Sequence, residues 1–350
     1  MRMDVFVPGG LVGAAPLAAR AEAAGFGAVW AGEMANDPML ALAAATEATS
    51  TIELGSAIVL AFARSPMVVA QQAWALADAT GGRFTLGLGT QVRPHITRRF
   101  SMPWSAPTPR MREYVAALRQ IWAVFEHGGP LDFRGERYQL TLMHPLFNPG
   151  PIAHPHIPIA LTGVGPRMTA LAGEIADGYQ LHVFSNPAYV SSITLPALTE
   201  GLTRAGRTRA DLWLFGYAFL AIGDTEEQRR EVAERIREQI AFYASTPMYR
   251  EVLDAVGYAD LQPELETLIK AGRIDDLPVL VDDTLLDHFM VSGTLEQIPQ
   301  RLHAKYGHYL DRVVSYYPIV ERDLDRLRQF TAAFDSLPNP SPSSTTAHTV

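Results

Sequence analysis

A short apolar strand, a two-glycine turn and an amphipathic helix follow one another in Pro158-Ile-Ala-Leu-Thr-Gly-Val-Gly-Pro-Arg-Met-Thr-Ala-Leu-Ala-Gly-Glu-Ile-Ala-Asp-Gly178. Pro166 suits the first helical turn, because its φ is preset and its missing N–H would have no partner there. The apolar residues that follow recur at helical spacing and predict one buried stripe: Met168, Leu171, Ala172 and Ile175. The stretch therefore predicts a strand–turn–helix unit of an α/β fold.

The same turn has the composition of an anion site. Gly163 and Gly165 would let the backbone approach a negative group at the positive end of the helix. Arg167 would add a charge-assisted contact. Taken alone, the two glycines favour ordinary turn geometry, because a single Gly-x-Gly pattern is a weak signal. The choice between the two interpretations depends on the rest of the chain.

Strands and helices alternate along the whole chain. Several of the apolar segments are continuous, as expected for strands that are buried on both faces of a parallel sheet. A helix begins at Thr225-Glu-Glu-Gln228, a capping-box pattern. Eight strands alternating with helices predict a (β/α)8 barrel, a TIM barrel. The predicted strands are Met3–Pro8, Ala28–Ala31, Ile52–Leu60, Phe84–Gly89, Pro158–Leu161, Gly178–His182, Leu212–Ile222 and Arg312–Tyr317.

Three long segments interrupt this alternation. Residues 90–107 and 127–156 are rich in Pro, Gly and His, and we expect both to lie over one mouth of the barrel. Residues 245–292 are expected to form short helices, Tyr249–Val256 and Pro263–Ala271, before the last strand. We expect residues 1–337 to form a single domain. The Pro- and Ser-rich tail 338–350 is expected to be disordered, since it has too little apolar surface to bury.

The composition excludes several classes of protein. The 350 residues carry a formal net charge of −8, which argues against nucleic acid or an anionic membrane as the main partner. There is no cysteine, so disulfides, thiolate catalysis and cysteine metal sites are excluded. The longest apolar run, Leu212–Ile222, is about half the length of a membrane span. We therefore expect a cytoplasmic protein with no membrane contact.

Several motifs in this order resemble the bacterial luciferase-like monooxygenase superfamily. They are Ala18–Trp30, Leu54–Leu60, Arg64-Ser-Pro66, Ala70–Gly89, Val291–Gln297 and Asp311–Tyr317. The resemblance covers residues 3–335, and the chain looks most like the branch that uses the deazaflavin coenzyme F420. The branch that uses flavin mononucleotide (FMN) shares the barrel and is the main alternative. The resemblance implies a luciferase-like barrel with its cofactor at the C-terminal mouth.

The resemblance also implies which residues hold the cofactor. The turn Gly163, Val164, Gly165 and Pro166 would bind its phosphate, with Arg167 beside it. In related deazaflavin enzymes the third strand ends in a bulge with a non-proline cis peptide, and the matching bond is Ala57–Ile58, after Ser56. A regular buried strand is the alternative there. Thr90, Gln91 and His95 are the expected contacts to the ring edge and the ribityl hydroxyls.

Three residues are candidate proton donors. Sugar-phosphate dehydrogenases of the family carry an acid at the position of Val92 and a histidine at that of Met34, which argues against sugar-phosphate oxidation here. Glu33 remains in that corner, either as a catalytic acid or as a structural carboxylate. His182 follows the sixth strand and is the first choice for relaying a proton, with His95 second; a structural histidine is the alternative.

Two further expectations concern ligands and partners. His144, His154 and His156 lie in a Pro-rich loop without a matched carboxylate, so no metal site is expected. We expect an F420-dependent oxidoreductase that transfers a hydride between the deazaflavin C5 and a small organic substrate, working as a homodimer or larger homo-oligomer. The alternatives are an FMN-dependent monooxygenase and a non-catalytic cofactor-binding protein.

Overall fold

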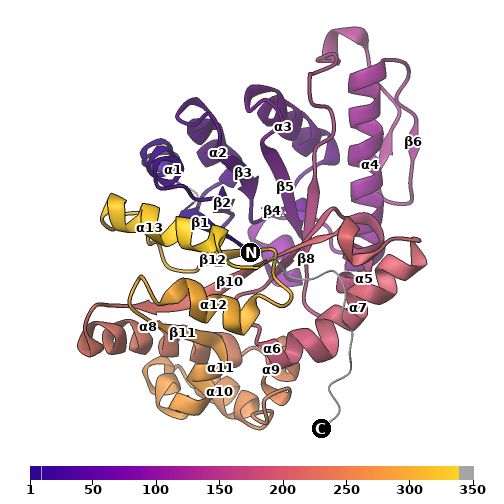
Figure 1. The fold of residues 1–350 in the computed structure, drawn as a ribbon. Helices are drawn as coiled ribbons and strands as arrows, with labels where there is room; N and C mark the ends of the chain where they lie inside the picture. The colour runs from indigo at the N-terminus through magenta and orange to yellow at the C-terminus, as the bar shows by residue number, and fades with distance from the viewer. Residues whose placement is uncertain (9, 339–350) are drawn as a thin grey trace.

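The computed structural model of the chain describes residues 1–8 and 10–338, and eight parallel strands form a closed ring at its centre (Figure 1). Strand β10 pairs with β9 on one side and with β12 on the other, and β12 pairs with β1, which closes the ring. The predicted (β/α)8 barrel is confirmed. In ring order the strands are β1 (Arg2–Pro8), β2 (Ala28–Gly32), β3 (Glu53–Ser56), β5 (Phe84–Gly89), β8 (Ile159–Thr162), β9 (Gly178–Leu181), β10 (Trp213–Ile222) and β12 (Arg312–Ser315).

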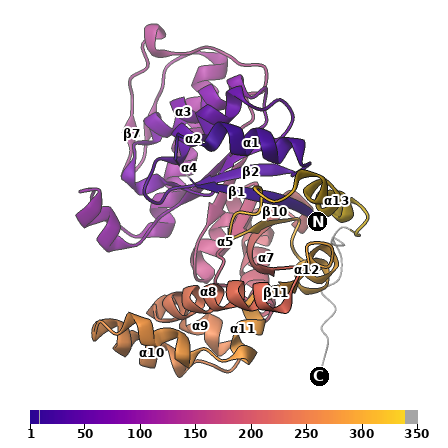
Figure 2. The ribbon, with the colours of Figure 1, turned by 90° about the vertical axis from the view of Figure 1, so that its left-hand side faces the viewer.

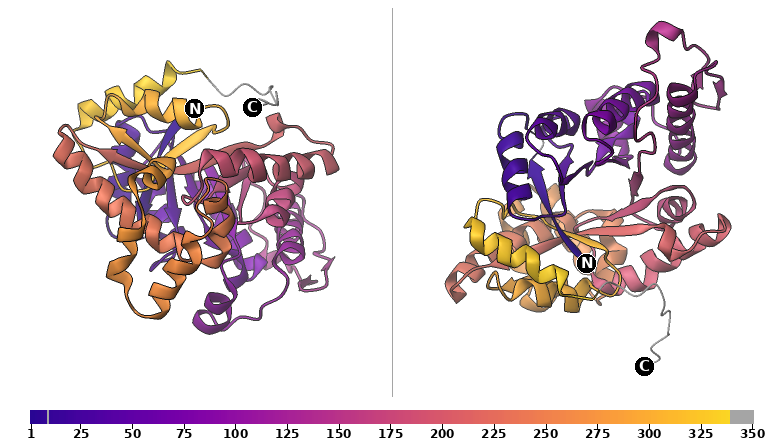
Figure 3. Two further views of the ribbon diagram at one scale, coloured as in Figure 1. Left: turned by 90° about the horizontal axis from the view of Figure 1, so that it is seen from below. Right: turned by 45° about the horizontal axis from the view of Figure 1, so that its top comes forward.

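Helices surround the ring, as the view from below in Figure 3 shows. The strands alternate between two cores, because successive side chains point to opposite faces. Val5 and Val7 of β1 are buried in the outer core under the helices, whereas Phe6 packs against the barrel interior. The helices are α1 (Ala14–Ala23), α2 (Pro38–Glu47), α3 (Pro66–Ala79), α4 (Pro107–His127), α5 (Pro166–Ile175), α7 (Leu195–Arg204), α8 (Glu226–Ala244), α12 (Ile298–Tyr306) and α13 (Leu324–Asp335).

Local sequence signals account for several helix starts. The predicted capping box is present at the start of α8, where the side chains of Thr225 and Gln228 each accept from the other residue's backbone N–H. In α3, the Ser65 hydroxyl accepts from the Met67 N–H and Pro66 occupies the first turn. These caps satisfy donors that the helix itself leaves free.

The third barrel strand is interrupted at the predicted bulge. The peptide bond between Ala57 and Ile58 is cis, which confirms that expectation. The chain then resumes as the short strand β4 (Val59–Leu60), which pairs with β5. Backbone bonds from Ala57 N to Ala31 O (2.7 Å) and from Glu33 N to Ile58 O (3.2 Å) hold the bulge against the end of β2. The expected single strand Ile52–Leu60 is therefore two short strands.

A second apolar core lies beyond the C-terminal end of the barrel. Strand β10 is longer than its neighbour β9, whose last residue Leu181 pairs with Gly216, so residues 217–222 extend past it. The extension pairs with β11 (Met290–Gly293). Around it lie α6 (Pro187–Tyr189), α9 (Arg250–Asp254), α10 (Leu261–Lys270) and α11 (Asp283–Phe289). Figure 2 shows α8 to α11 together on one side of the molecule.

This second core confirms one expectation and corrects another. The short helices expected between residues 245 and 292 are present. Strand β11 was not expected, because Val291-Ser-Gly resembled the approach to the closing helix and four residues with a Ser and a Gly carry little strand signal. Its pairing with β10 supplies the structure that the local sequence does not predict.

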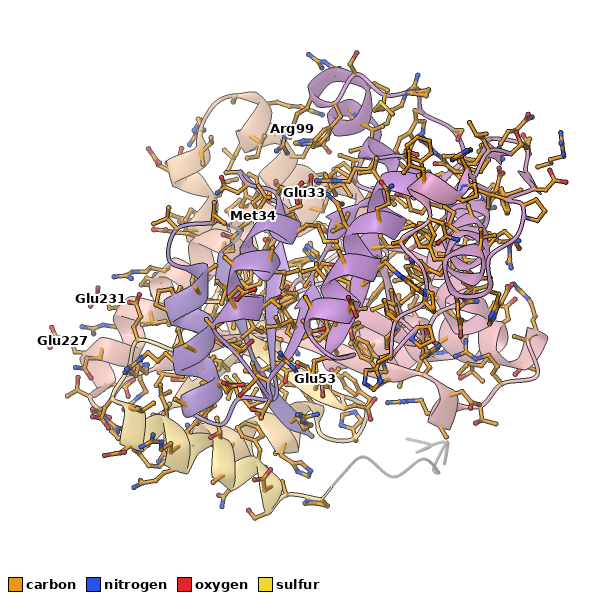
Figure 4. The ribbon with its side chains drawn as sticks, turned by 90° about the horizontal axis from the view of Figure 1, so that it is seen from above. Glu33, Met34, Glu53, Arg99, Glu227 and Glu231 are labelled. Atoms are coloured by element: carbon orange, nitrogen blue, oxygen red, sulfur yellow. The ribbon has the colours of Figure 1, made fainter. Side chains whose placement is uncertain are left out.

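Of the two segments expected over the mouth, only one lies there. Residues 90–106 do cover the mouth: Arg99 Nη2 donates to the Met34 carbonyl at 2.7 Å, and Figure 4 shows both residues near Glu33 at one end of the barrel. Residues 127–156 instead run along α4, which corrects the expectation. They form the hairpin β6 (Phe133–Arg134) and β7 (Gln139–Leu140), and Asn148 Nδ2 donates to the Val124 carbonyl at 3.0 Å.

The chain end is described only up to Pro338, whose carbonyl accepts from His303 Nε2 at 2.8 Å. The rest of the tail that we expected to be disordered, 339–350, lies outside the described residues. No helix in the described ranges is both long and apolar enough to cross a bilayer.

Candidate active site at the barrel mouth

Side chains fill the barrel interior below the mouth. At the N-terminal end the fully buried Asp4 carboxylate accepts from Arg312 Nε at 2.6 Å. Above this pair, the rings of Trp30 and Phe215 stack at 4.6 Å. In Figure 4, Glu53 lies at this filled end, far from Glu33. A ligand therefore has access to the C-terminal mouth, where barrel enzymes build their sites.

Two hydrogen bonds across the barrel form the floor of the mouth. Gln180 Nε2 donates to the Ser56 carbonyl at 3.0 Å, and the Tyr217 hydroxyl donates to the Ala57 carbonyl at 3.3 Å. Both acceptors belong to the bulge in the third strand, and both donors come from β9 and β10 on the opposite wall. The floor thus orients the backbone of Ser56 and Ala57, two of the predicted cofactor contacts.

The bulge depends on glycine at a close approach. A Cβ added to Gly89 would lie 2.2 Å from the Ile58 Cδ1 atom, so any larger residue at the end of β5 would displace the Ile58 side chain. The Ser56 hydroxyl bridges the same two strands, accepting from Gly87 N at 2.8 Å and donating to Gly87 O at 2.9 Å. Ile58 therefore lies over the start of the segment that carries Thr90 and Gln91.

Gln91 has an unusual backbone for its residue type. Its φ is +55°, in the left-handed region that non-glycine residues rarely adopt. Its side-chain Oε1 accepts from the Val92 N–H at 2.9 Å, so this side chain stabilises the turn itself. Thr90, one residue earlier, is half-buried directly after β5. Their predicted contacts with a cofactor stay predictions.

The predicted phosphate turn has an open helix start. Gly165 precedes α5 with a φ of +91°, and a Cβ added there would meet no atom within 4 Å. No side chain caps the first turn of α5. The turn is held from below, since the Tyr179 hydroxyl donates to the Gly163 carbonyl at 2.8 Å. Arg167 is exposed in the same first turn. This arrangement leaves backbone donors and a positive side chain free to meet an anion.

His182 lies in an aromatic cluster rather than free in the mouth. Its ring stacks on Tyr249 at 5.0 Å and meets the edge of Tyr243 at 5.0 Å. Phe184 N donates to Nδ1 at 3.1 Å, so the neutral ring carries its proton on Nε2, which donates to the Tyr249 hydroxyl at 3.2 Å. Burial lowers the pKa of His182 to about 4. The ring is therefore neutral at pH 7 and holds no imidazolium proton to donate.

The position of His182 also links it to the cofactor turn. His182 and Tyr249 line one small cavity together with Gly163 and Val164. We expected His182 to face the substrate; the structure places it beside the predicted phosphate turn. Burial raises the pKa of Tyr249 to about 12, so its hydroxyl stays protonated next to this cavity. A role for His182 in proton relay stays a prediction.

His95, the second candidate for proton relay, lies well past the end of its strand. It begins a short helical turn, His95–Arg99, six residues past the end of β5, and its side chain is exposed. Tertiary packing of this turn is carried by Ile96, which is fully buried. The structure therefore separates His95 from His182 and gives the two residues different surroundings.

Glu33 is tied into the barrel end by strong contacts. Its Oε2 accepts from Arg64 Nη1 at 2.7 Å and from Leu60 N at 2.9 Å, and its side chain is only 5% exposed. The other arm of Arg64 binds Asp37 at 2.9 Å. Of the two interpretations of Glu33, these contacts favour the structural carboxylate, because both bonds anchor β4 and the segment after it to the end of β2.

The histidines of the Pro-rich loop serve other contacts. The His144 Nδ1 accepts from Leu146 N at 3.2 Å, and the ring of His154 lies over Gly82. Within residues 1–8 and 10–338, no group of three or more His, Asp or Glu side chains is placed to hold a metal ion.

Sequence reasoning missed the tyrosines of the mouth. Tyr217 and Tyr316 take the inward register of β10 and β12. Tyr243 reaches the same region from the end of α8, and Tyr249 reaches it from the segment that follows. The signal was present in β10, where Trp213, Phe215 and Tyr217 alternate at the spacing of one strand face. This alternation was not recognised because both faces of the strand are apolar.

Comparisons with known proteins agree with this fold. Residues 9–312 match the family described as luciferase-like monooxygenase. An uncharacterized protein of Mycobacterium tuberculosis is 41% identical over 317 residues, which cover 91% of this chain and 93% of that protein. A second M. tuberculosis protein, named as a candidate coenzyme F420-dependent oxidoreductase, is 30% identical over 309 residues, covering 82% of this chain and 86% of that protein.

A solved structure supports the same architecture. The coenzyme F420-dependent tetrahydromethanopterin reductase of Methanopyrus kandleri superposes with a TM-score of 0.77 at 21% identity, covering 94% of this chain and 96% of that one. At this identity the likeness concerns the fold. Together with the family match over residues 9–312, these findings establish that the chain belongs to the luciferase-like monooxygenase family.

Proposed function

We propose that this protein is a coenzyme F420-dependent oxidoreductase that transfers a hydride between the deazaflavin C5 and a small organic substrate. The observation that carries the proposal is the placement of two features on neighbouring strands. The bulge at Ala57–Ile58 leads into β4, which pairs with β5. The uncapped start of α5 follows β8, which also pairs with β5. One side of the mouth therefore offers a backbone wall and an anion site next to each other.

The residues present fit such a cofactor. An anionic phosphate suits the free first-turn N–H groups of α5, the open space at Gly165 and the exposed Arg167. A flat ring suits the wall made by Ala57 and Ile58. The floor hydrogen bonds hold the carbonyls of Ser56 and Ala57, and Glu33 N holds that of Ile58. Val164 and Pro166 complete the turn, and Thr90, Gln91 and His95 follow β5 as candidate contacts to the ring edge and the ribityl hydroxyls.

The chemistry divides between cofactor and protein. When bound, a reduced deazaflavin supplies the hydride. The chain's own residues bind and orient the two reactants, and Ile58 excludes water from the wall. A proton must accompany hydride transfer to a carbonyl. The hydroxyls of Tyr217 and Tyr249 keep their protons at neutral pH because burial raises their pKa, whereas His182, with a pKa near 4, is not protonated.

The relatives make the deazaflavin the first choice. The relative at 30% identity, which aligns with 82% of this chain, is named for coenzyme F420, and this supports the F420 branch. The family description, luciferase-like monooxygenase, keeps FMN as the second candidate. A non-catalytic cofactor-binding protein would use the same phosphate turn without turnover.

A titration of both cofactors tests the proposal. Tryptophan fluorescence of the full chain is followed while F420 or FMN is added, and F420 is expected to bind more tightly. Equal or reversed affinities contradict the deazaflavin assignment. Oxygen consumption with reduced FMN would support the monooxygenase, and tight F420 binding without turnover over a broad panel of alcohols and ketones would support the binding protein.

A further inference from the structure

The mouth has two unlike halves. On β2, β3–β4, β5 and β8 the inward positions at the mouth hold small side chains or none: Gly32, Ala57, Gly89 and Thr162. On β9, β10, β12 and β1 inward positions hold rings: His182, Tyr217, Tyr316 and Phe6, of which Phe6 is level with Trp30 of β2 rather than with Gly32. The small half is the one assigned above to the cofactor. The aromatic half faces it across the barrel. Tyr217 holds the Ala57 carbonyl and His182 lies beside the phosphate turn, but none of these rings is among the assigned cofactor contacts.

The register of the strands places these rings at the mouth. Trp213 and Phe215 of β10 fill the interior below, so Tyr217 is the next inward residue toward the C-terminal end. Val314 of β12 belongs to the same interior cluster. Tyr316 N donates to Ala218 O at 2.9 Å, which extends the β10–β12 ladder by one residue and keeps Tyr316 in the inward register.

The rings form two groups of contacts, which a hydrogen bond between the hydroxyls of Tyr316 and Tyr243 joins. Phe6 meets the edge of Tyr217 at 5.9 Å, and Tyr217 meets the edge of Tyr316 at 6.4 Å. Tyr243 then meets His182, which stacks on Tyr249. These rings form what we call the aromatic wall: Phe6, Tyr217, Tyr316, Tyr243, His182 and Tyr249. Each of the six side chains is half-buried, so the wall keeps an accessible surface.

The wall also carries a spare hydrogen-bond donor. The hydroxyls of Tyr316 and Tyr243 lie 2.9 Å apart, and neither has another hydrogen-bond partner in residues 1–8 and 10–338. Each hydroxyl has one hydrogen, and the bond between them uses one of the two. Burial, with Tyr316 beside it, raises the pKa of Tyr243, so the Tyr243 hydroxyl keeps its proton at neutral pH. One hydrogen is therefore left for an acceptor on a third molecule.

We propose that the aromatic wall binds the substrate, and that the substrate is a planar conjugated molecule whose oxygen accepts a hydrogen bond from the Tyr243–Tyr316 pair. Flat π-systems pack on Tyr and His rings by stacking and edge contacts, which a saturated ring of the same size does not reproduce. The hydroxyl pair suits a carbonyl oxygen conjugated to that ring. This inference rests on the proposed function, because it assigns the substrate class of the same site.

Two ketones of matched size test the substrate class. Acetophenone and cyclohexyl methyl ketone are titrated into the full chain, with and without F420, and binding is followed by saturation-transfer NMR. Acetophenone is expected to bind about tenfold more tightly, given the worth of one or two aromatic contacts. Equal affinities, tighter binding of the saturated ketone, or no binding of either ketone would overturn the proposal.

Two variants test the wall itself. Tyr316→Phe keeps the ring and removes the spare donor, and is expected to weaken acetophenone about fivefold while preserving the preference over the saturated ketone. Tyr316→Leu removes the ring and is expected to abolish most of that preference. Tyr258→Phe is the matched control, because its hydroxyl binds Asp282 on the surface of the insertion. An unchanged acetophenone affinity in Tyr316→Phe contradicts the role of the hydroxyl pair.

The outcome separates this inference from the proposed function. Tight F420 binding without a preference for the aromatic ketone would leave the cofactor assignment in place and overturn the wall. A preference for acetophenone in a protein that binds FMN better than F420 would do the reverse. The ketone measurement without cofactor makes the two results independent.

Discussion

Gln180 Nε2 donates a hydrogen bond of 3.0 Å to the carbonyl oxygen of Ser56 across the barrel, although the two residues are 124 positions apart in the chain. Gln180 is 2% exposed, so water does not compete for this bond. The bond fixes one side of the bulge against which a cofactor ring would lie. Loss of this bond should therefore lower both the free energy of unfolding and the affinity for the cofactor.

Replacement of Gln180 by Met keeps the volume and removes the donor. We expect the free energy of unfolding to fall by about 1–3 kcal/mol, because the Ser56 carbonyl loses a buried partner. Urea unfolding measures the change, and the F420 titration should show weaker binding. Gln72→Met is the matched control, since Gln72 Oε1 is buried without a hydrogen-bond partner in the described residues. An equal loss of stability in both variants would mean that replacing a buried glutamine by methionine, and not the loss of the bond to Ser56, causes the effect.

Replacement of Glu33 by Gln tests the structural interpretation of this carboxylate. The variant weakens the bond to Arg64, and we expect a loss of about 1–3 kcal/mol in the free energy of unfolding. Asp37→Asn, which alters the more exposed arm of the same arginine, should cost less than about 1 kcal/mol. A large fall in kcat with unchanged stability would instead make Glu33 the catalytic acid.

Replacement of Gly165 by Asp should weaken cofactor binding. The new carboxylate would stand at the uncapped start of α5 and repel a phosphate there. The added Cβ meets no atom within 4 Å, so steric crowding does not contribute to this effect.

Gly165→Ala separates charge from backbone in this test. Its φ of +91° strains any residue with a Cβ, at a cost of about 1–2 kcal/mol in stability. The affinity difference between the Asp and Ala variants, measured by fluorescence titration, then reports the charge alone. Identical affinities in the two variants would place the phosphate elsewhere.

Stability should fall in mild acid because of His182. Its pKa is about 4 in the folded protein and 6.5 in the unfolded chain, since burial disfavours the charged ring. Below pH 6.5 His182 binds a proton in the unfolded chain but not yet in the folded protein. The free energy of unfolding therefore decreases from pH 6.5 down to about pH 4 and then levels off. At about 1.4 kcal/mol for each pH unit, the loss reaches about 3 kcal/mol.

Denaturant unfolding between pH 4 and pH 7 measures this slope. His182→Asn removes the titration while its side-chain oxygen can still accept from the Phe184 N–H, so the variant should lose most of the dependence in this window. His154→Asn is the control, because that ring lies on the outer surface over Gly82. A variant slope equal to that of the parent protein would mean that other groups produce the acid sensitivity.

Local sequence patterns predicted the frame of this protein well. The eight barrel strands, the capping box at Thr225 and Gln228, and the glycine turn before α5 all depend on residues within a few positions of one another. The cis bond at Ala57–Ile58 was predicted from the resemblance, since nothing near it in the sequence requires a cis peptide. Strand β11 was missed because its stability comes from pairing with β10 rather than from its own four residues.

The chemistry of the mouth was less accessible from the sequence. His182 was identified by its place after a strand, but its neutral state follows from burial among rings that come later in the chain, Tyr243 at the end of α8 and Tyr249 after it. The tyrosine pair had no signal of its own, because Tyr243 and Tyr316 meet over 73 positions of sequence.

The ordered motifs indicated the family, and the barrel and the glycine turn before α5 followed from strand alternation, helix caps and turn residues, which depend on neighbouring residues. Only the tertiary structure decided what each side chain at the mouth contacts. It paired Glu33 with Arg64, lowered the pKa of His182 and set an aromatic half of the mouth against a small one. The physical reason is that burial and hydrogen bonding depend on side chains that the closed ring of strands brings together from distant parts of the chain.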